Sequence, residues 1–221
     1  MRLPAAERAF AGLPRILVAG VLAFAAAVAG AQDVAPDVLV KNVTLEVIDI
    51  IAQDKDIKAG NQRKVIELVE AKVLPHFNFN GMTALAMGQG WKQASAEQKK
   101  RLIEEFRTLL VRTYSSALAA YSDQKFEFRP LRAKPTDTDV TVNVRVLQPG
   151  AQAVTIDYDM EKTPGGWKVY NVYVAGVSLV QNYRTDFANQ VRDSGIDGLI
   201  KTLQSKNKSL EQRAAASTEK K

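Results

Sequence analysis

The sequence has 221 residues, of which 46% are hydrophobic and 24% charged, and its formal net charge is +6. This composition is typical of a globular protein and excludes a fibrous or largely disordered chain. There is no cysteine, which excludes disulfides, thiolate chemistry and a lipid anchor on cysteine. Lys and Arg are dispersed rather than clustered, so the positive charge does not predict nucleic-acid binding.

Residues 1–31 have the pattern of a secretory signal peptide. Arg2, Arg8 and Arg15 flank or precede an apolar run over 16–29, and the run closes on small residues up to Ala31. It is shorter than the roughly 20 apolar residues of a membrane-spanning helix. We therefore expect export to the periplasm with cleavage near Ala31. An uncleaved N-terminal anchor is the alternative.

Helical periodicity dominates the first half of the remaining chain, over 36–122. A first amphipathic helix is predicted from Pro36 to about Ile51. A second, over 65–73, is expected to stop before Pro75, because proline disfavours helical geometry in the residue preceding it.

A short helix is predicted over 80–87, followed by the longest helix of the chain. Ser95 and Gln98 have the spacing of a capping box, and apolar residues then recur on one helical face. This helix is expected to end near Tyr121.

The apolar period changes from about 3.6 to 2 over 125–178, which predicts strands. Alternating segments lie near 126–128, 140–146, 154–160 and 167–178, joined by short turns rich in glycine and proline. Consecutive strands with short connections favour an antiparallel sheet with one apolar face. Together with the flanking helices, this predicts an α+β fold with a curved four-stranded sheet and an apolar cavity beneath the helices.

The C-terminal part, 178–205, is predicted to be helical. Ser178 and Gln181 repeat the capping-box spacing, and Gly195 is a candidate C-cap before a last short helix. Residues 206–221 are charged and rich in Ala and Ser, and we expect a disordered tail there. The sequence thus predicts one domain over 32–205.

The sequence offers little for catalysis or metal binding. His76 is the sole histidine, and without cysteine it cannot build a common metal site. No nucleophile-elbow or phosphate-loop motif is present. Asp157 and Asp159 fit the solvated face of a strand better than an acid–base pair. We therefore expect neither an enzyme nor a cofactor or metal.

Three segments resemble the MlaC/toluene-tolerance family in order and spacing: Val73–Trp91, Glu105–Tyr114 and Trp167–Leu179, the last followed by Asn182-Tyr-Arg184. The resemblance extends over about 36–205. It implies an NTF2-like sheet with added helices and a periplasmic phospholipid carrier that helps to maintain outer-membrane lipid asymmetry. The implied partners are phospholipid, an inner-membrane ABC transporter of the Mla type and an outer-membrane lipoprotein/porin complex. We expect a monomer.

The chain departs from the usual family pattern at four positions. Asn78 and Asn171 stand where family members usually have Asp, and Gly81 and Gln89 stand where they usually have Arg. These changes lower the local charge near any partner or headgroup contacts in those regions. The apolar positions of the expected cavity are unaffected.

The candidate lipid-binding residues are apolar or aromatic and come from the longest helix and the sheet. They are Phe106, Leu109, Leu110, Tyr114, Leu118, Val142, Val144, Val146, Ile156, Tyr158, Val169, Val172 and Val174. Val169 cannot face the cavity together with Val172 and Val174 unless a bulge intervenes, because successive strand residues face opposite sides. For the headgroup phosphate, the candidates are Arg112, Arg145 and Arg184.

Two other functions are compatible with the same pattern. A periplasmic protein-interaction module could use the apolar groove for a peptide or a partner helix. An enzyme of the same fold acting on an apolar substrate would need a polar pair deep in the cavity. Tyr158 and Asp157 are the nearest pair, but neighbouring strand residues point to opposite faces.

Overall fold

The computed structural model describes residues 34–119, 124–134 and 136–218, all within the unit Asp33–Lys221. The predicted signal peptide lies outside the described residues. The elements, in chain order, are α1 (Pro36–Gln53), α2 (Lys55–Lys58), α3 (Gln62–Leu68), η1 (Val69–Val73), η2 (Leu74–His76), α4 (Phe79–Met87), α5 (Gly90–Gln93), α6 (Ala96–Ala119), β1 (Lys125–Phe128), β2 (Asp139–Leu147), β3 (Val154–Thr163), β4 (Gly166–Val174), β5 (Val177–Ser178), η3 (Gln181–Tyr183) and α7 (Arg184–Thr218).

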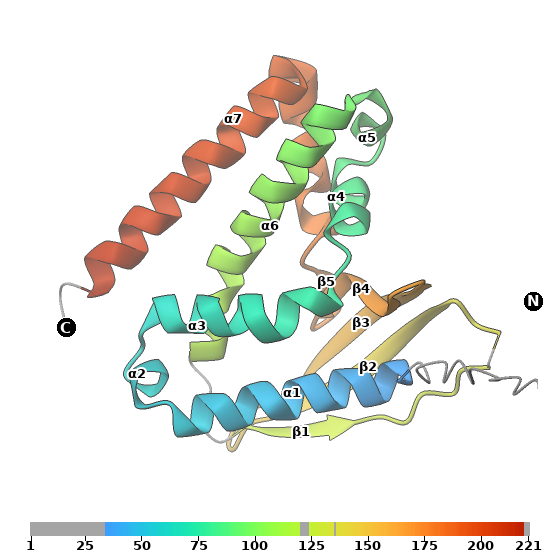
Figure 1. The fold of residues 1–221 in the computed structure, drawn as a ribbon, viewed down its shortest axis with the longest axis vertical. Helices are drawn as coiled ribbons and strands as arrows, with labels where there is room; N and C mark the ends of the chain where they lie inside the picture. Colours follow the sequence, from blue (N-terminus) through green and yellow to red (C-terminus); the bar gives the residue numbers. More distant parts are fainter. Residues whose placement is uncertain (1–33, 120–123, 135, 219–221) are drawn as a thin grey trace, which may run out of the picture. The chain divides into compact units, whose positions relative to one another are not determined.

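Helices α1 and α3 form a layer of their own, and they lie next to each other in Figure 1. Proline at the first position of α1 costs no hydrogen bond, because the first backbone N–H groups of a helix have no intrahelical acceptor. The second predicted helix begins earlier than expected and changes form before Pro75. After α3 the chain continues as the π-helical turn η1 and the 3₁₀ turn η2.

The long helix α6 begins with the predicted capping box. The backbone N–H of Ser95 donates to Gln98 Oε1 at 3.0 Å, and the N–H of Gln98 donates to Ser95 Oγ at 3.2 Å. Two otherwise unpaired donors at the helix start are therefore satisfied. At the second predicted box, Gln181 N–H donates to Ser178 Oγ at 2.9 Å, and this serine ends β5 rather than opening a regular α-helix.

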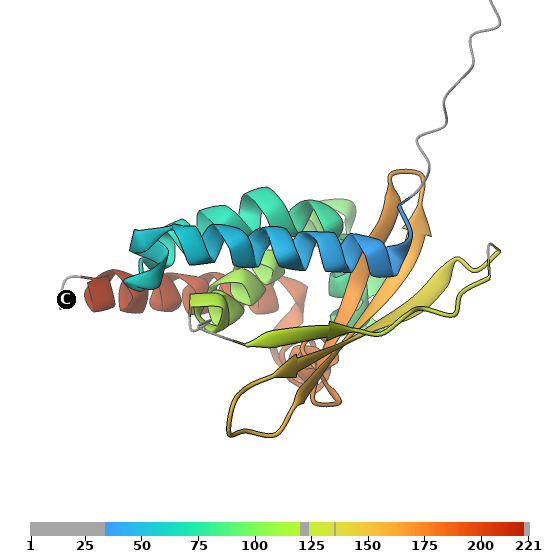
Figure 2. The same cartoon turned by 90° about the horizontal axis from the view of Figure 1, so that it is seen from below.

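The strands form one antiparallel sheet in the order β1-β2-β3-β4-β5, so the α+β class and the antiparallel meander are confirmed. Figure 2 shows α1 lying along one side of these strands. In the described part of the chain the sheet has five strands rather than four, because the last predicted strand is folded back on itself. Ala175 and Gly176 both have positive φ, which makes the tight turn between β4 and β5.

Helix α7 continues to Thr218, so the prediction of a disordered tail was wrong for 206–218. Gly195, at φ 69° and ψ 178°, kinks the helix where a C-cap was predicted. Beyond the kink, the helix is held to α6. Asn207 Nδ2 donates to the Glu105 backbone carbonyl at 2.9 Å, and the Arg112 guanidinium donates to the Asn207 carbonyl at 2.6 Å.

The buried residues form three apolar clusters. One joins α4, α6 and α7 around Phe106, which contacts Tyr183 and Phe187 edge to face. A second lies on the concave side of the sheet, and a third joins α1, α2, α3 and η1. The space between the second and third clusters is not fully packed, and the candidate site lies there.

Candidate functional site: an apolar cavity between α1 and the sheet

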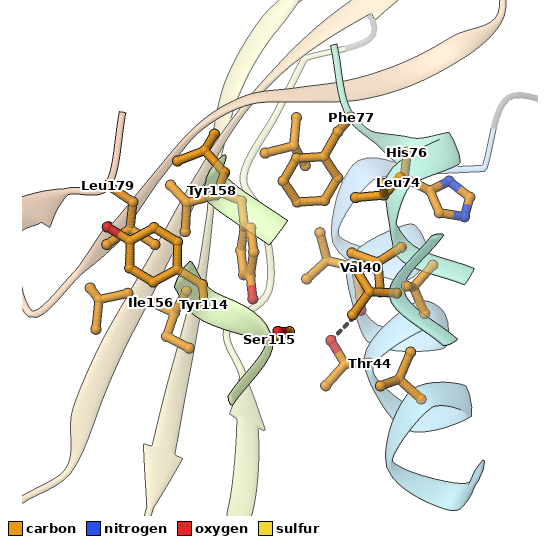
Figure 3. Close-up of a pocket in the computed structure, with 18 of the residues that line it drawn as sticks. Val40, Thr44, Leu74, His76, Phe77, Tyr114, Ser115, Ile156, Tyr158 and Leu179 are labelled. Carbon is orange, nitrogen blue, oxygen red and sulfur yellow. Dashed lines mark hydrogen bonds between the residues drawn. The ribbon is translucent and has the colours of Figure 1, made fainter. Parts of the chain in front are cut away.

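A cavity of about 610 Å³ lies between α1, η1 and η2 on one side and the sheet on the other, with the C-terminal part of α6 contributing to its wall. Its volume falls within the roughly 300–1,000 Å³ typical of ligand pockets. Among the described residues, those that line it include no Asp, Glu, Lys or Arg. Figure 3 shows aliphatic and aromatic side chains converging on this space from the helices and from the strands.

The helical wall comes mainly from α1. Its apolar residues recur at helical spacing and face the cavity: Leu39, Val40, Val43, Val47, Ile48 and Ile51. Val40, Val47 and Ile51 are also buried by packing, so the same stripe attaches the helix and lines the cavity. The next segment adds Leu74, Phe77 and Phe79.

The sheet wall depends on a β-bulge in β4. Asp159 pairs with Asn171, but the next residue, Met160, pairs with Val169, so Tyr170 is an extra residue in β4. The bulge resets the alternation of the strand. Val169, Val172 and Val174 consequently all line the cavity.

Eight of the thirteen predicted lipid-binding residues line the cavity. They are Leu110, Tyr114, Val146, Ile156, Tyr158, Val169, Val172 and Val174.

Four other candidates are buried away from it, because close packing leaves them no free surface. Phe106 and Leu109 belong to the cluster with α7, and Val142 and Val144 are at most 2% exposed within the sheet cluster. The side chain of Leu118 is outside those that the structure describes.

The three arginines predicted to meet a phosphate at the mouth are not among the lining residues. Arg112 binds α7 through the Asn207 carbonyl and Glu211, and Arg145 pairs with Glu127 at 2.9 Å on the opposite face of β2. Arg184 packs against Gly88, where an added Cβ would lie 3.0 Å from its Nε. These contacts do not bring any of the three arginines into the cavity lining, and their contact with a phosphate stays a prediction.

Sequence reasoning missed the contribution of α1. The sequence predicts an amphipathic helix there, but an apolar helix stripe usually indicates only core packing. The exposed fraction of these side chains does not separate core packing from cavity lining. The signal that could have identified the cavity residues is the excess of apolar residues, since Leu39 and Ile48 widen the stripe beyond what one helix contact needs.

Four hydroxyl groups interrupt the apolar wall: those of Thr44, Tyr114, Ser115 and Tyr158. Thr44 donates to the Val40 carbonyl at 2.7 Å, and Tyr114 shares a hydrogen bond with Tyr183. Burial raises the pKa of Tyr158 to about 12, so its hydroxyl remains protonated at neutral pH. The Tyr158 ring carries that hydroxyl into the cavity, and Ser115 and Thr44 are drawn on the side towards which it points (Figure 3).

His76 lies at the cavity wall without a catalytic arrangement. Partial burial, followed by the charge of Lys168, lowers its pKa below the ordinary value, so the ring is neutral at pH 7. Among the described residues, no hydrogen bond joins it to a serine or a carboxylate. The same residues contain no group of His, Cys, Asp or Glu with the geometry of a metal site.

The carboxylates of β3 face the other side of the sheet, where amide groups bind them. Asp157 accepts a hydrogen bond from Asn143 Nδ2 at 2.7 Å, and Asp159 accepts one from Asn171 Nδ2 at 3.2 Å. Glu161 accepts one from Asn78, the N-cap residue of α4. The asparagines at 78 and 171 are thus donors to carboxylates.

An arginine in place of Gly81 would have to displace the side chains of Asn78 and Tyr170. A Cβ added to Gly81 would lie 3.1 Å from the Asn78 side chain and 3.3 Å from Tyr170 Cβ. Gln89, by contrast, is exposed beside the small pocket between α5 and α7.

Within the described residues, no helix combines the length and apolar character needed to cross a bilayer.

Comparison with known proteins places this chain in a family. The model of the MlaC protein family matches residues 41–205. The chain is 28% identical over 159 residues to the intermembrane phospholipid transport system binding protein MlaC of Haemophilus influenzae, covering 67% of this chain and 74% of the relative. It is 26% identical over 169 residues to the toluene tolerance protein ttg2D of Pseudomonas putida, covering 76% and 78%.

A solved structure shares the fold. The phospholipid-binding protein of Ralstonia solanacearum, determined at 1.53 Å in complex with a phospholipid, has a TM-score of 0.73 and 38% sequence identity to this chain. The match covers 79% of this chain and 98% of that one. Since the family model spans most of the described domain, the chain belongs to the MlaC family.

Proposed function

We propose that this protein is a phospholipid carrier that holds acyl chains in the cavity between α1 and the sheet. The observation that carries the proposal is the wall itself, about 610 Å³ of space whose described lining is mainly aliphatic and aromatic and contains no Asp, Glu, Lys or Arg. The solved relative from Ralstonia solanacearum, which is in complex with a phospholipid, supports it.

The physical need for such a cavity follows from the transfer free energy of lipid tails. A two-tailed lipid exposes about 30 methylenes in water, and at about 0.8 kcal/mol each this costs on the order of 25 kcal/mol. A carrier offsets this cost by surrounding the tails with apolar side chains. Because the wall carries no ion, the headgroup charge is expected to stay outside, where water solvates it.

The cellular role follows from the same proposal. The protein acts in the periplasm after removal of its signal peptide and exchanges phospholipid with an inner-membrane ABC transporter of the Mla type and an outer-membrane lipoprotein/porin complex. The name of the Haemophilus relative, an intermembrane phospholipid transport system binding protein, supports a role in moving phospholipid between membranes. Carriage needs binding and release, with no covalent step.

The first experiment compares two neighbouring residues of β3. Ile156 lines the cavity, whereas Thr155 is exposed on the other face and pairs with Arg145 across the sheet. The domain is purified without detergent, extracted with organic solvent, and analysed for lipid by mass spectrometry beside its native mass. Ile156→Glu should lose phospholipid, since it places a charge among the tails. Thr155→Glu should retain it.

Near-stoichiometric phospholipid in the unmodified protein and in Thr155→Glu, with loss in a folded Ile156→Glu, would support the proposal. A lipid-free protein of unliganded mass would contradict it and favour a peptide or partner helix as occupant. Circular dichroism establishes that each variant is folded.

A further inference from the structure

Two hydroxyl groups in the cavity wall have no hydrogen-bond partner. Ser115 is only 3% exposed, and its Oγ is unpaired, although a serine inside a helix commonly donates to the carbonyl four residues earlier. Tyr158 is half-buried and lines the cavity from β3, and within the described residues its hydroxyl makes no hydrogen bond. Buried polar groups are normally paired.

The other two hydroxyls of the wall make hydrogen bonds within the protein. Thr44 donates to the Val40 carbonyl at 2.7 Å, and Tyr114 is paired with Tyr183. These two are satisfied by the protein itself. Ser115 and Tyr158 therefore stand out as wall hydroxyls without a hydrogen-bond partner among the described residues.

The surroundings define the chemistry of a group that would pair with these two hydroxyls. A neutral group fits best, because the described lining contains no cation to compensate a phosphate or a carboxylate. A protonated tyrosine hydroxyl can donate a hydrogen bond, so an acceptor next to the acyl chains would satisfy it. A glycerophospholipid has one group of this kind next to its acyl chains, the ester carbonyl.

We propose that Ser115 and Tyr158 form a polar subsite that donates hydrogen bonds to the ester carbonyl oxygens of a bound glycerolipid. This inference rests on the proposed function and deepens it. The two donors fix the depth of the lipid, since the ester stops where they lie and the chains continue among the apolar residues. The substrate class is then ester-linked lipids in preference to ether-linked ones of the same shape.

The test is a competition between a diacyl and a dialkyl phosphatidylethanolamine with the same chain length, followed by native mass spectrometry of the loaded protein. The two lipids share headgroup and tails and differ in the carbonyls. The unmodified protein should prefer the diacyl lipid by roughly five- to tenfold, as expected for one or two neutral hydrogen bonds. The double variant Ser115→Ala/Tyr158→Phe should bind both lipids equally.

Thr108→Val is the matched control, because it removes from the same helix as Ser115 a hydroxyl that donates to the Glu104 carbonyl at 2.9 Å and does not line the cavity. It should keep the preference for the diacyl lipid. Circular dichroism and the thermal midpoint show that the variants are folded, and removal of unpaired hydroxyls should not lower that midpoint.

Each other outcome overturns a different statement. If the unmodified protein binds neither lipid, the proposed carrier function fails. If it binds both equally, or if the double variant keeps its preference, the ester subsite fails while the carrier function stands. If the folded double variant loses both lipids alike, the hydroxyls bind the headgroup phosphate and the ester assignment is wrong.

Discussion

Val169 and Val172 line the same wall of the cavity although they are three positions apart in one strand. In a regular strand this spacing would put them on opposite faces. The extra residue, Tyr170, makes the difference, because it leaves Met160 paired with Val169 and Asp159 paired with Asn171. The bulge therefore lets both halves of β4 contribute apolar side chains to one cavity.

Buried and cavity-lining valines should differ in what they contribute to stability. Val144 is 1% exposed and closely packed, whereas Val174 is half-buried and lines the cavity. Val144→Ala should lower the free energy of unfolding by about 2 kcal/mol, because it creates a new void. Val174→Ala should cost less than about 1 kcal/mol. Urea denaturation of the lipid-free protein measures both, and equal losses would contradict the distinction.

The side-chain amide of Asn171 should be essential for the stability of the fold. The residue is 1% exposed, and its Nδ2 donates to Asp159 while its Oδ1 accepts from Ser178 at 2.7 Å. Asn171→Asp would place two carboxylates together in a buried position and should lower the free energy of unfolding by about 3 kcal/mol. Adding Asp159→Asn should restore more than half of the loss, because one amide again faces one carboxylate.

Asn143→Asp is the control for that pair. It sets a carboxylate beside Asp157 on the same sheet face but in a half-buried position, where solvent screens the repulsion. Its cost should stay below about 1 kcal/mol. Chemical denaturation of Asn171→Asp, Asp159→Asn, their double variant and Asn143→Asp gives the coupling directly. A double variant no more stable than Asn171→Asp alone would refute the assignment.

The kink of α7 should require glycine. Gly195 has φ 69° and ψ 178°, a region that is essentially restricted to glycine. Gly195→Ala should therefore lower the free energy of unfolding by about 1–3 kcal/mol. Gly165→Ala is the control, since an added Cβ there meets only side-chain atoms at 3.8 Å and 3.9 Å. A Gly195→Ala variant as stable as the control would show that the helix tolerates another path.

Alkaline pH should destabilise the fold through its buried tyrosines. Burial raises the pKa of Tyr158 and of Tyr183 from 10.0 to about 12. A raised folded-state pKa means that the stabilisation is complete below pH 10 and is lost as the pH rises towards 12, since the unfolded chain releases its protons first. Tyr158→Phe should make the fall in stability between pH 10 and 12 less steep. Denaturation curves across this range measure the slope, and an unchanged slope would contradict the prediction.

Much of the fold could be predicted because its local signals are strong. The Ser95–Gln98 capping box and the alternation in β2 and β3 are properties of neighbouring residues, and both appear in the structure. The helical tail could not be predicted in the same way. Its apolar residues are sparse, and it is held by contacts to α6, such as that of Asn207 with Glu105, that composition does not reveal.

The candidate site was predictable in part for a similar reason. Apolar strand residues such as Ile156 could be selected by alternation, but alternation cannot separate a cavity residue from a packed one such as Val144. The difference depends on what lies opposite each side chain. The positions of the arginines depend on acidic or carbonyl partners that the sequence pattern does not reveal. Glu127, for example, binds Arg145 on the outer face of the sheet.

The wall of the cavity joins the first helix of the domain to its last long strand. Helix α1 ends at Gln53 and β4 begins at Gly166, so on the order of 100 residues separate the two surfaces. Contacts between such distant segments form late, because a long loop must close before they add any stability. During synthesis, the part of α1 that faces the sheet is therefore made long before β4, the strand on the opposite wall. Val47 and Ile51 can pack early against α2, α3 and η1, whereas Val40 meets the sheet only when the final third of the chain has been made.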